Sequence, residues 1–275
     1  MFSLRRNLWG EVMLGLVILA VLIPIVWMVV LAVQPGKNIV SGGWQFGFTT
    51  SNFESLFAPG EPYAAQFLNS LVIVVGTVVL CLVVGTLAGY SLGNPSWSPK
   101  ATVVLLGGAA IIPVLPPMAL VPGLYATLQG LGLLGSIAGL ILLNTVFNLP
   151  FTVLLMRVYF SYVPRELREA ALIDGASEFT TFRKVILPLA APGAASAAIY
   201  TAIMTWNDFL FGLTMTTGGT TSPITVGIGA LVQPNNPEWG KMAAAGTITA
   251  LPILVVAVVA RRRIVSGITQ GAVKG

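Results

Sequence analysis

The 275-residue sequence contains no histidine, a single cysteine and few charges, 14 basic and nine acidic residues. Without histidine it has neither a thiol–imidazole pair nor the mixed Cys/His ligands of a zinc site. Its single cysteine, Cys81, cannot form a disulfide framework within the chain. A serine hydrolase would need a histidine or lysine base, and no lysine lies inside an apolar segment. We therefore expect no enzyme activity, no catalytic residue and no metal site.

The sequence also lacks the features of two kinds of self-sufficient transporter. ATP binding needs a glycine-rich loop ending in Gly-Lys-Ser or Gly-Lys-Thr. The two Gly-Lys pairs, at 36–37 and 240–241, are followed instead by asparagine and methionine. Ion-coupled carriers usually hold several carboxylates within the membrane and have repeated halves. Here only Asp208 is a candidate and no repeat is visible, so an ion-coupled secondary carrier is the less favoured alternative.

Apolar residues dominate what is present. They make up 56% of the chain, charged residues make up 8%, and the mean hydropathy is +0.89, whereas soluble domains are about a quarter charged. A membrane-spanning helix needs about 20 mostly apolar residues. Six segments satisfy this, namely 11–33, 68–92, 101–122, 138–156, 189–211 and 242–260. The sequence therefore predicts an all-α, polytopic integral membrane protein with six transmembrane helices in one domain, 1–275.

The first apolar segment follows Arg5 and Arg6, as the core of a signal peptide would. Its apolar run is too long for a signal peptide, however, and no convincing small-residue cleavage site follows Val33. We therefore expect a retained helix.

The basic residues are distributed unevenly across the predicted topology. Six spans place both termini on one side of the membrane, together with twelve of the 14 basic residues, and leave only Lys37 and Lys241 opposite. By the positive-inside rule, both termini are expected in the cytoplasm of a multi-pass cell-membrane protein. The isoelectric point near 9.6 then reflects orientation in the lipid bilayer, and no nucleic-acid partner is expected.

Small residues and prolines recur inside the apolar segments. Gly85-x-x-x-Gly89 and the small-residue run 190–198 allow close helix approach, within the chain, against a partner or in a self-dimer. Prolines inside the segments should kink the helices. They are Pro24, Pro113, Pro116, Pro117, Pro150, Pro192 and Pro252.

Charge is concentrated in the segment 162–188, between the fourth and fifth apolar segments. Pro164 suits the first turn of a helix over Arg165 to Asp174, and Gly175 is its expected stop. Ser177 is the expected cap of a second helix, which Pro188 ends. The pattern is a short helix, a glycine turn and another helix.

This segment contains Glu169-Ala170-Ala171, three residues, Gly175, nine residues and then Val185-Ile186-Leu187-Pro188. It resembles the EAA loop of permease subunits in binding-protein-dependent ABC importers, although the family pattern has isoleucine at the position of Val185. The stretches 173–177, 187–189, 206–208 and 271–275 are similar to the carbohydrate-uptake branch, specifically the maltose-type second permease subunit. The resemblance covers nearly the whole chain.

The resemblance implies a permease that couples ATPase closure to alternating access for a disaccharide or oligosaccharide. Its implied partners are a second homologous permease, two cytoplasmic ATPase subunits and an extracytoplasmic solute-binding protein. ATP and magnesium would be bound by the ATPase subunits, and no cofactor by this chain. Another polar cargo, such as glycerol phosphate, is the alternative within the same family. The implied ATPase-coupling residues, in a cytoplasmic loop between the fourth and fifth helices, are Glu169, Ala170, Ala171, Asp174, Gly175, Leu187 and Pro188.

The C-terminal tail, 264–275, is too short and too polar to span a membrane. It carries glycines at 267, 271 and 275, so we expect that it does not fold by itself. By the same resemblance it reaches the ATPase subunits, and the candidate contact residues are Gln270, Gly271 and Lys274.

Polar residues at membrane depth indicate a candidate translocation path. Asn144 and Asn148, four residues apart, share one helix face, and Trp206-Asn207-Asp208 lies towards the outer end of the fifth segment. Hydrogen-bonding groups beside a flat aromatic ring suit a sugar. The alternative is that Asp208 lies at the interface as a structural cap or partner, since in this family the other permease chiefly holds the sugar.

Overall fold

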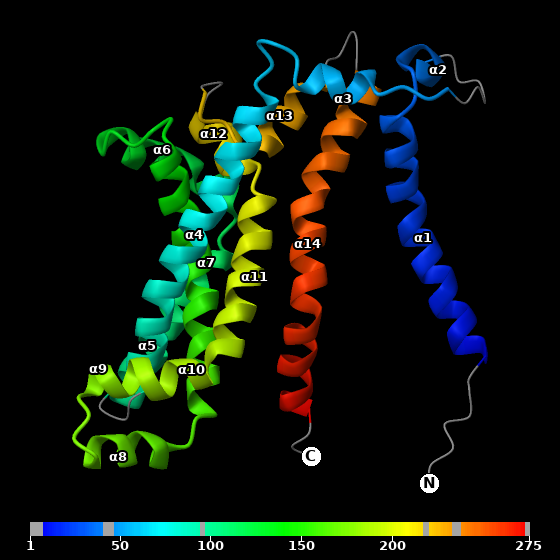
Figure 1. The fold of residues 1–275 in the computed structure, drawn as a ribbon. Coiled ribbons are helices and arrows are strands. Elements are labelled where there is room, and N and C mark those ends of the chain that lie inside the picture. The colour runs from blue at the N-terminus through cyan, green and yellow to red at the C-terminus, as the bar shows by residue number, and fades with distance from the viewer. Residues whose placement is uncertain (1–7, 41–46, 94–96, 217–219, 233–237, 273–275) are drawn as a thin grey trace. The chain divides into compact units, whose positions relative to one another are not determined.

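The computed structural model describes residues 8–40, 47–93, 97–216, 220–232 and 238–272. Arg5, Arg6 and Lys274 lie outside the described residues. In the described ranges every regular element is a helix, so the predicted all-α class is confirmed (Figure 1).

In chain order the elements are α1 (Leu8–Ala32), α2 (Gly36–Val40), α3 (Ser51–Leu56), α4 (Tyr63–Leu92), α5 (Pro99–Ile111), the 3₁₀ turn η1 (Ile112–Val114), α6 (Pro117–Gly130), α7 (Ile137–Ser161), α8 (Arg165–Ile173), α9 (Glu178–Thr181), the π-helical turn η2 (Phe182–Ile186), α10 (Leu187–Leu189), α11 (Ala191–Trp206), α12 (Leu210–Thr216), α13 (Ile224–Ala230) and α14 (Trp239–Ala272).

Four of the described helices are long and apolar enough to cross a membrane: α1, α4, α7 and the Trp239–Val258 part of α14. The number rises to six if each of two bent helix pairs is counted as one span. In one pair, Pro99–Val114 meets α6 at 102°, and in the other, Glu178–Leu189 meets α11 at 72°. The chain is therefore a multi-span helical membrane protein, as the sequence predicts.

The third predicted segment, 101–122, is broken where a kinked but continuous helix was expected. η1 ends at Val114, and Leu115 and Pro116 adopt extended backbone before α6 begins. A residue that precedes proline is pushed out of the helical conformation, and this holds for Leu115 and again for Pro116. The consecutive prolines therefore interrupt the helix, where a kink in a continuous helix was expected.

Two other predicted boundaries shift. The fifth segment, 189–211, contains two helices, because α11 ends at Trp206 and α12 begins at Leu210. The tail expected not to fold by itself is helical as far as Ala272, as the end of α14. Residues added to an existing helix need no new nucleus, which explains why glycines at 267 and 271 do not stop it.

By its contacts the chain divides into two units, Met1–Ala64 with Gly227–Leu251, and Ala65–Val226 with Pro252–Gly275. In the first unit, the Asn52 side-chain amide on α3 donates to the Ala32 and Gln34 carbonyls at 3.0 and 2.9 Å. The Tyr63 hydroxyl donates to the Ala245 carbonyl at 3.0 Å. The Lys241 ammonium lies 2.7 Å from the Glu61 carboxylate. These contacts join α1, α3 and the start of α14.

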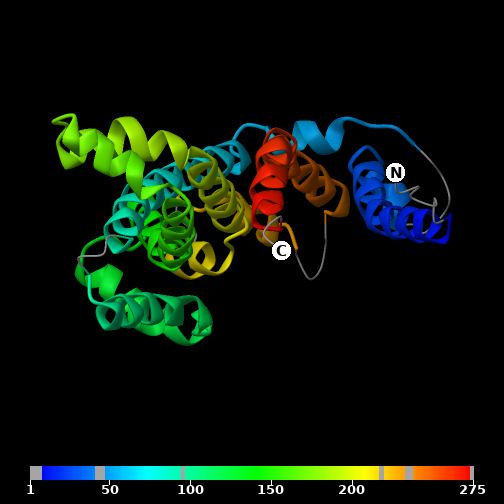
Figure 2. The same ribbon diagram turned by 90° about the horizontal axis from the view of Figure 1, so that it is seen from below.

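In the second unit, α4 and α11 pack against α7, as seen along these helices from the α8 end (Figure 2). A Cβ added at Gly85 would lie 2.5 Å from the Thr152 methyl carbon, and one at Gly89 would lie 2.9 Å from the Met156 Cβ. The Gly-x-x-x-Gly pair therefore serves packing within the chain. Gly193 of the small-residue run lies similarly close to the Tyr159 ring.

Candidate functional site

The charged segment folds as the sequence predicts at its first helix. α8 begins after Pro164 and ends at Ile173, and Gly175 has φ +81°, the left-handed conformation expected of the stop residue. The Gly175 N–H donates to the Leu172 carbonyl at 3.1 Å, and the Ala176 N–H donates to the Ala171 carbonyl at 3.0 Å. This pair of bonds is the Schellman ending, which fixes where α8 stops.

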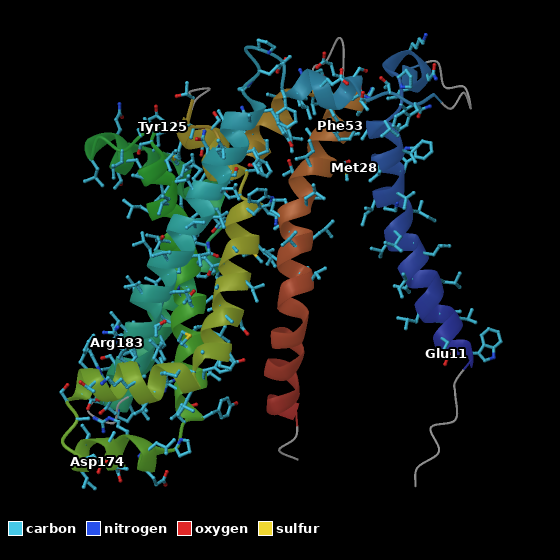
Figure 3. The ribbon with its side chains drawn as sticks, viewed as in Figure 1. Glu11, Met28, Phe53, Tyr125, Asp174 and Arg183 are labelled. Carbon is cyan, nitrogen blue, oxygen red and sulfur yellow. The ribbon has the colours of Figure 1, made fainter. Side chains whose placement is uncertain are left out.

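The second helix of the segment is less regular than predicted. The Ser177 hydroxyl accepts from the Thr180 N–H at 3.3 Å, so Ser177 is the predicted cap. The helix then passes through η2, on which Figure 3 labels Arg183, and ends at Leu189, one residue beyond Pro188. Pro188 lies just after η2 and has no N–H to donate to the preceding turn of the helix.

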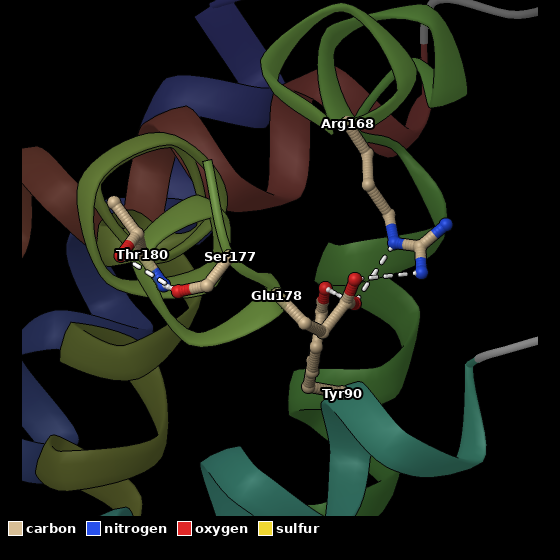
Figure 4. Close-up of polar contacts among 5 residues, drawn as sticks. All are labelled: Tyr90, Arg168, Ser177, Glu178 and Thr180. Atoms are coloured by element: carbon tan, nitrogen blue, oxygen red, sulfur yellow. Dashed lines mark hydrogen bonds and ion pairs between the residues drawn. The ribbon is translucent and has the colours of Figure 1, made fainter. Parts of the chain in front are cut away.

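Three side chains connect α8 to α9 and α4 (Figure 4). The Arg168 guanidinium donates to both carboxylate oxygens of Glu178 at 2.9 Å, and the Tyr90 hydroxyl donates to Glu178 Oε1 at 2.6 Å. The hydrogen bond to Glu178, followed by that to Tyr90, raises the pKa of Arg168. We call Tyr90, Arg168 and Glu178 the polar clamp.

An aromatic cluster lies beside the polar clamp. The Tyr90 ring centroid is 5.5 Å from that of Phe160 and 4.8 Å from that of Phe182. Buried Met156 and Ile186 complete this cluster. It joins η2 to α4 and α7, so the loop rests on a packed base.

The remaining surface of α8 is open, and none of its residues is buried. Ile173 is 85% exposed and Phe179, just after the turn, is 66% exposed. Of the predicted coupling residues, Ala171 and Leu187 are half-buried and the others are exposed, namely Glu169, Ala170, Asp174, Gly175 and Pro188. The loop thus exposes apolar and charged side chains, while the polar clamp and the aromatic cluster hold it in place.

The structure brings together three of the five candidate path residues. The Asn144 side-chain amide donates to Asp208 Oδ2 at 3.3 Å, and that of Asn148 donates to the Asn144 carbonyl at 2.8 Å. Asp208 Oδ1 accepts from the Phe211 N–H at 3.2 Å, in the first turn of α12. These contacts are those of a structural cap and partner.

The other two path candidates lie differently. Trp206 is only 5% exposed and packs edge-on against Phe67, with ring centroids 5.6 Å apart. Asn207 is exposed, and its side-chain amide donates to the Ile203 carbonyl at 2.7 Å. In this conformation the Trp206 ring offers no open face for stacking.

The polar clamp is the part of the site that the sequence does not reveal. The sequence shows Arg168 and Glu178 as a basic and an acidic residue ten positions apart. Nothing in the sequence indicates that Tyr90, 88 positions before Glu178, contacts them. Of the predicted tail contacts, Gln270 and Gly271 lie on α14. Across the described ranges, no group of three or more Cys, Asp or Glu side chains is arranged to hold a metal ion.

Comparisons with known proteins agree with this architecture. Residues 82–270 match the family described as "Binding-protein-dependent transport system inner membrane component". The chain is 33% identical over 274 residues to the trehalose transport system permease protein SugB of Mycobacterium tuberculosis, covering 98% of this chain and 99% of that protein. It is 29% identical over 270 residues to the trehalose/maltose transport system permease protein MalG of Thermococcus litoralis, covering 95% of each.

The fold is similar to a solved structure described as "Crystal structure of a bacterial ABC transporter involved in the import of the acidic polysaccharide alginate". The TM-score is 0.79 at 22% identity, and the match covers 95% of this chain and 98% of that one. At this identity the likeness concerns the fold alone. The family match spans more than half of the chain, and the identity to the mycobacterial protein extends over nearly all of it. The chain therefore belongs to the binding-protein-dependent transport system inner membrane component family, the permease subunits of ABC importers.

Proposed function

We propose that this chain is the transmembrane permease subunit of an ATP-driven importer of a disaccharide or oligosaccharide. The observation that carries the coupling role is the open surface of α8 on a frame fixed by the polar clamp and Gly175. The sugar cargo is supported by relatives named for trehalose and for trehalose/maltose.

The proposed coupling mechanism follows from how α8 is held. In this mechanism α8 docks into a cleft on one of the partner ATPase subunits. When these subunits close on ATP, α8 moves with that subunit. The polar clamp transmits this movement to α4 and α9, and the aromatic cluster transmits it to α7. Rigid, packed elements move together, so the spans switch between inward- and outward-facing arrangements. The surface that engages the ATPase comprises Glu169, Ala170, Ala171, Asp174 and Gly175, with Leu187 and Pro188 at the end of the loop.

The proposed assembly contains a second homologous permease, two cytoplasmic ATPase subunits and an extracytoplasmic solute-binding protein. The family description itself supports the binding protein. ATP and magnesium are bound by the ATPase subunits, and this chain binds no cofactor. Both termini are cytoplasmic, and the C-terminal end, with Gln270, Gly271 and Lys274, reaches the ATPase.

A translocation path beside Asn144, Asn148 and Asp208 is part of the proposal. Polar side chains within apolar helices are costly and usually face a cavity or a partner. Trp206 and Asn207 adjoin this cluster in sequence, and they join the path only in a conformation that uncovers the Trp206 ring.

Reconstitution tests the function. The complete assembly in liposomes should accumulate a sugar only with ATP and binding protein, whereas this chain alone should accumulate none above empty vesicles. Ion-driven uptake by the chain alone would support the secondary carrier instead. A binding protein that retains glycerol phosphate but no sugar would support the alternative cargo.

Single-cysteine labelling tests the topology. The native cysteine, Cys81, is buried, and it is first replaced by serine so that the introduced cysteine is the one that reacts. A cysteine is then introduced at exposed Ala58 or at exposed Lys184. The uneven distribution of basic residues predicts that an impermeant reagent in intact cells labels position 58 and not position 184. In inside-out vesicles the pattern should invert. Labelling of both positions from one side would contradict six spans with cytoplasmic termini.

A further inference from the structure

A cavity of about 290 Å³ lies near the ends of four helices, apart from the polar clamp. Its lining comes from the end of α4, the start of α5, the last turns of α7 and the first residue of α8. The residues that matter here are Leu92, Trp97, Thr102, Val103, Arg157 and Arg165. Its volume is near the lower end of ligand pockets, which hold about 300 to 1,000 Å³.

The polar side of this cavity is positively charged. Arg157 is half-buried and makes one long hydrogen bond, from Nε to the Leu92 carbonyl at 3.4 Å. Among the described residues, no carboxylate lies within salt-bridge distance of Arg157 or Arg165. The start of α5 adds the positive end of a helix dipole. An anionic group would therefore be stabilised here.

The other side of the cavity is apolar and continues onto a surface suited to lipid. Val103 is 70% exposed, and Trp97 is a residue type that favours the membrane–water interface. Arg157 lies one turn before the end of α7, a membrane-spanning helix. A free phosphate ion would use the arginines but would gain nothing from the apolar surface.

We propose that this cavity binds the phosphate headgroup of an anionic phospholipid, with an acyl chain along the exposed face of α5. Basic pockets between membrane helices bind such headgroups. Because Arg165 begins α8, a bound lipid would hold the start of that helix against the bilayer. The inference concerns binding and does not depend on the proposed cargo or coupling.

Native mass spectrometry of the purified full-length chain tests the site. The probes are dioleoyl phosphatidylglycerol, dioleoyl phosphatidylcholine and glycerol 3-phosphate. Arg165→Gln should weaken phosphatidylglycerol binding about fivefold, the change that corresponds to about 1 kcal/mol per basic residue. Arg157→Gln together with Arg165→Gln should weaken it about thirtyfold, by the same conversion. Arg183→Gln, an equal charge change at an exposed position of η2, should leave it within about twofold.

Several results would overturn the proposal. They are equal retention of phosphatidylcholine, unchanged binding in the Arg165→Gln protein, and full displacement of phosphatidylglycerol by glycerol 3-phosphate, which would indicate a free-anion site. If the double variant fails to fold, Arg165→Gln alone decides, because Arg165 is exposed and its replacement should not disturb packing.

Discussion

Replacing Gly175 with valine should uncouple ATP hydrolysis from transport while leaving the chain inserted in the membrane. A Cβ at this position would meet no atom within 4 Å, so space is not the obstacle. The obstacle is φ +81°, which costs an L-residue about 1–2 kcal/mol. Relaxation to negative φ would break the bond from the Ala176 N–H to the Ala171 carbonyl and redirect the end of α8. A redirected α8 would no longer fit the ATPase.

The measurement is solute-stimulated ATPase activity and sugar uptake in the reconstituted assembly. Uptake by the Gly175→Val protein should fall by about tenfold or more, since each 1.4 kcal/mol changes an equilibrium about tenfold. Gly175→Asn is the matched control, because asparagine tolerates the left-handed conformation, and it should retain most activity. Wild-type stimulation and uptake in the valine variant would show that this loop is not the coupling site.

The local features of the loop were predictable from sequence, because each depends on a few neighbouring residues. Pro164, Gly175 and Ser177 act through their own backbone or their own nearest N–H groups. The polar clamp was not predictable, because Tyr90 comes from a different helix and only the folded chain brings it to Glu178. Local chemistry determines where helices begin and end, whereas packing decides which of them are joined.

The third apolar segment, 101–122, shows the same difference between what local residues determine and what packing determines. Its prolines predicted a kink, and the structure has a 102° bend. The break itself follows from Pro116 and Pro117, which force the preceding residues out of the helix. In the folded chain η1 also contacts α7, a contact that no local sequence pattern contains. Asp208 likewise had two interpretations in the sequence, and only the folded chain brings its carboxylate to the Asn144 amide and the Phe211 N–H.

Gly89→Ala should destabilise the protein although alanine is the better helix former. The added Cβ would lie 2.9 Å from the Met156 Cβ, 3.0 Å from the Arg157 nitrogen and 3.1 Å from the Val153 oxygen. Two of these are backbone atoms, so α7 itself must shift, and overpacking of this kind typically costs about 1–3 kcal/mol. The free energy of unfolding in detergent, measured with increasing denaturant, should fall by about that amount.

Gly107→Ala on α5 is the matched control for this packing prediction. A Cβ there meets no atom within 4 Å, so the substitution should gain up to about 1 kcal/mol of helix propensity and leave the protein as stable or slightly more stable. Equal stability of the two variants would contradict the close approach of α4 to α7. If Gly89 instead served a self-dimer, Gly89→Ala would lower the dimer fraction without changing the stability of the monomer. The opposite response to the same added methyl group at Gly89 and Gly107 therefore distinguishes packing within the chain from helix propensity and from self-association.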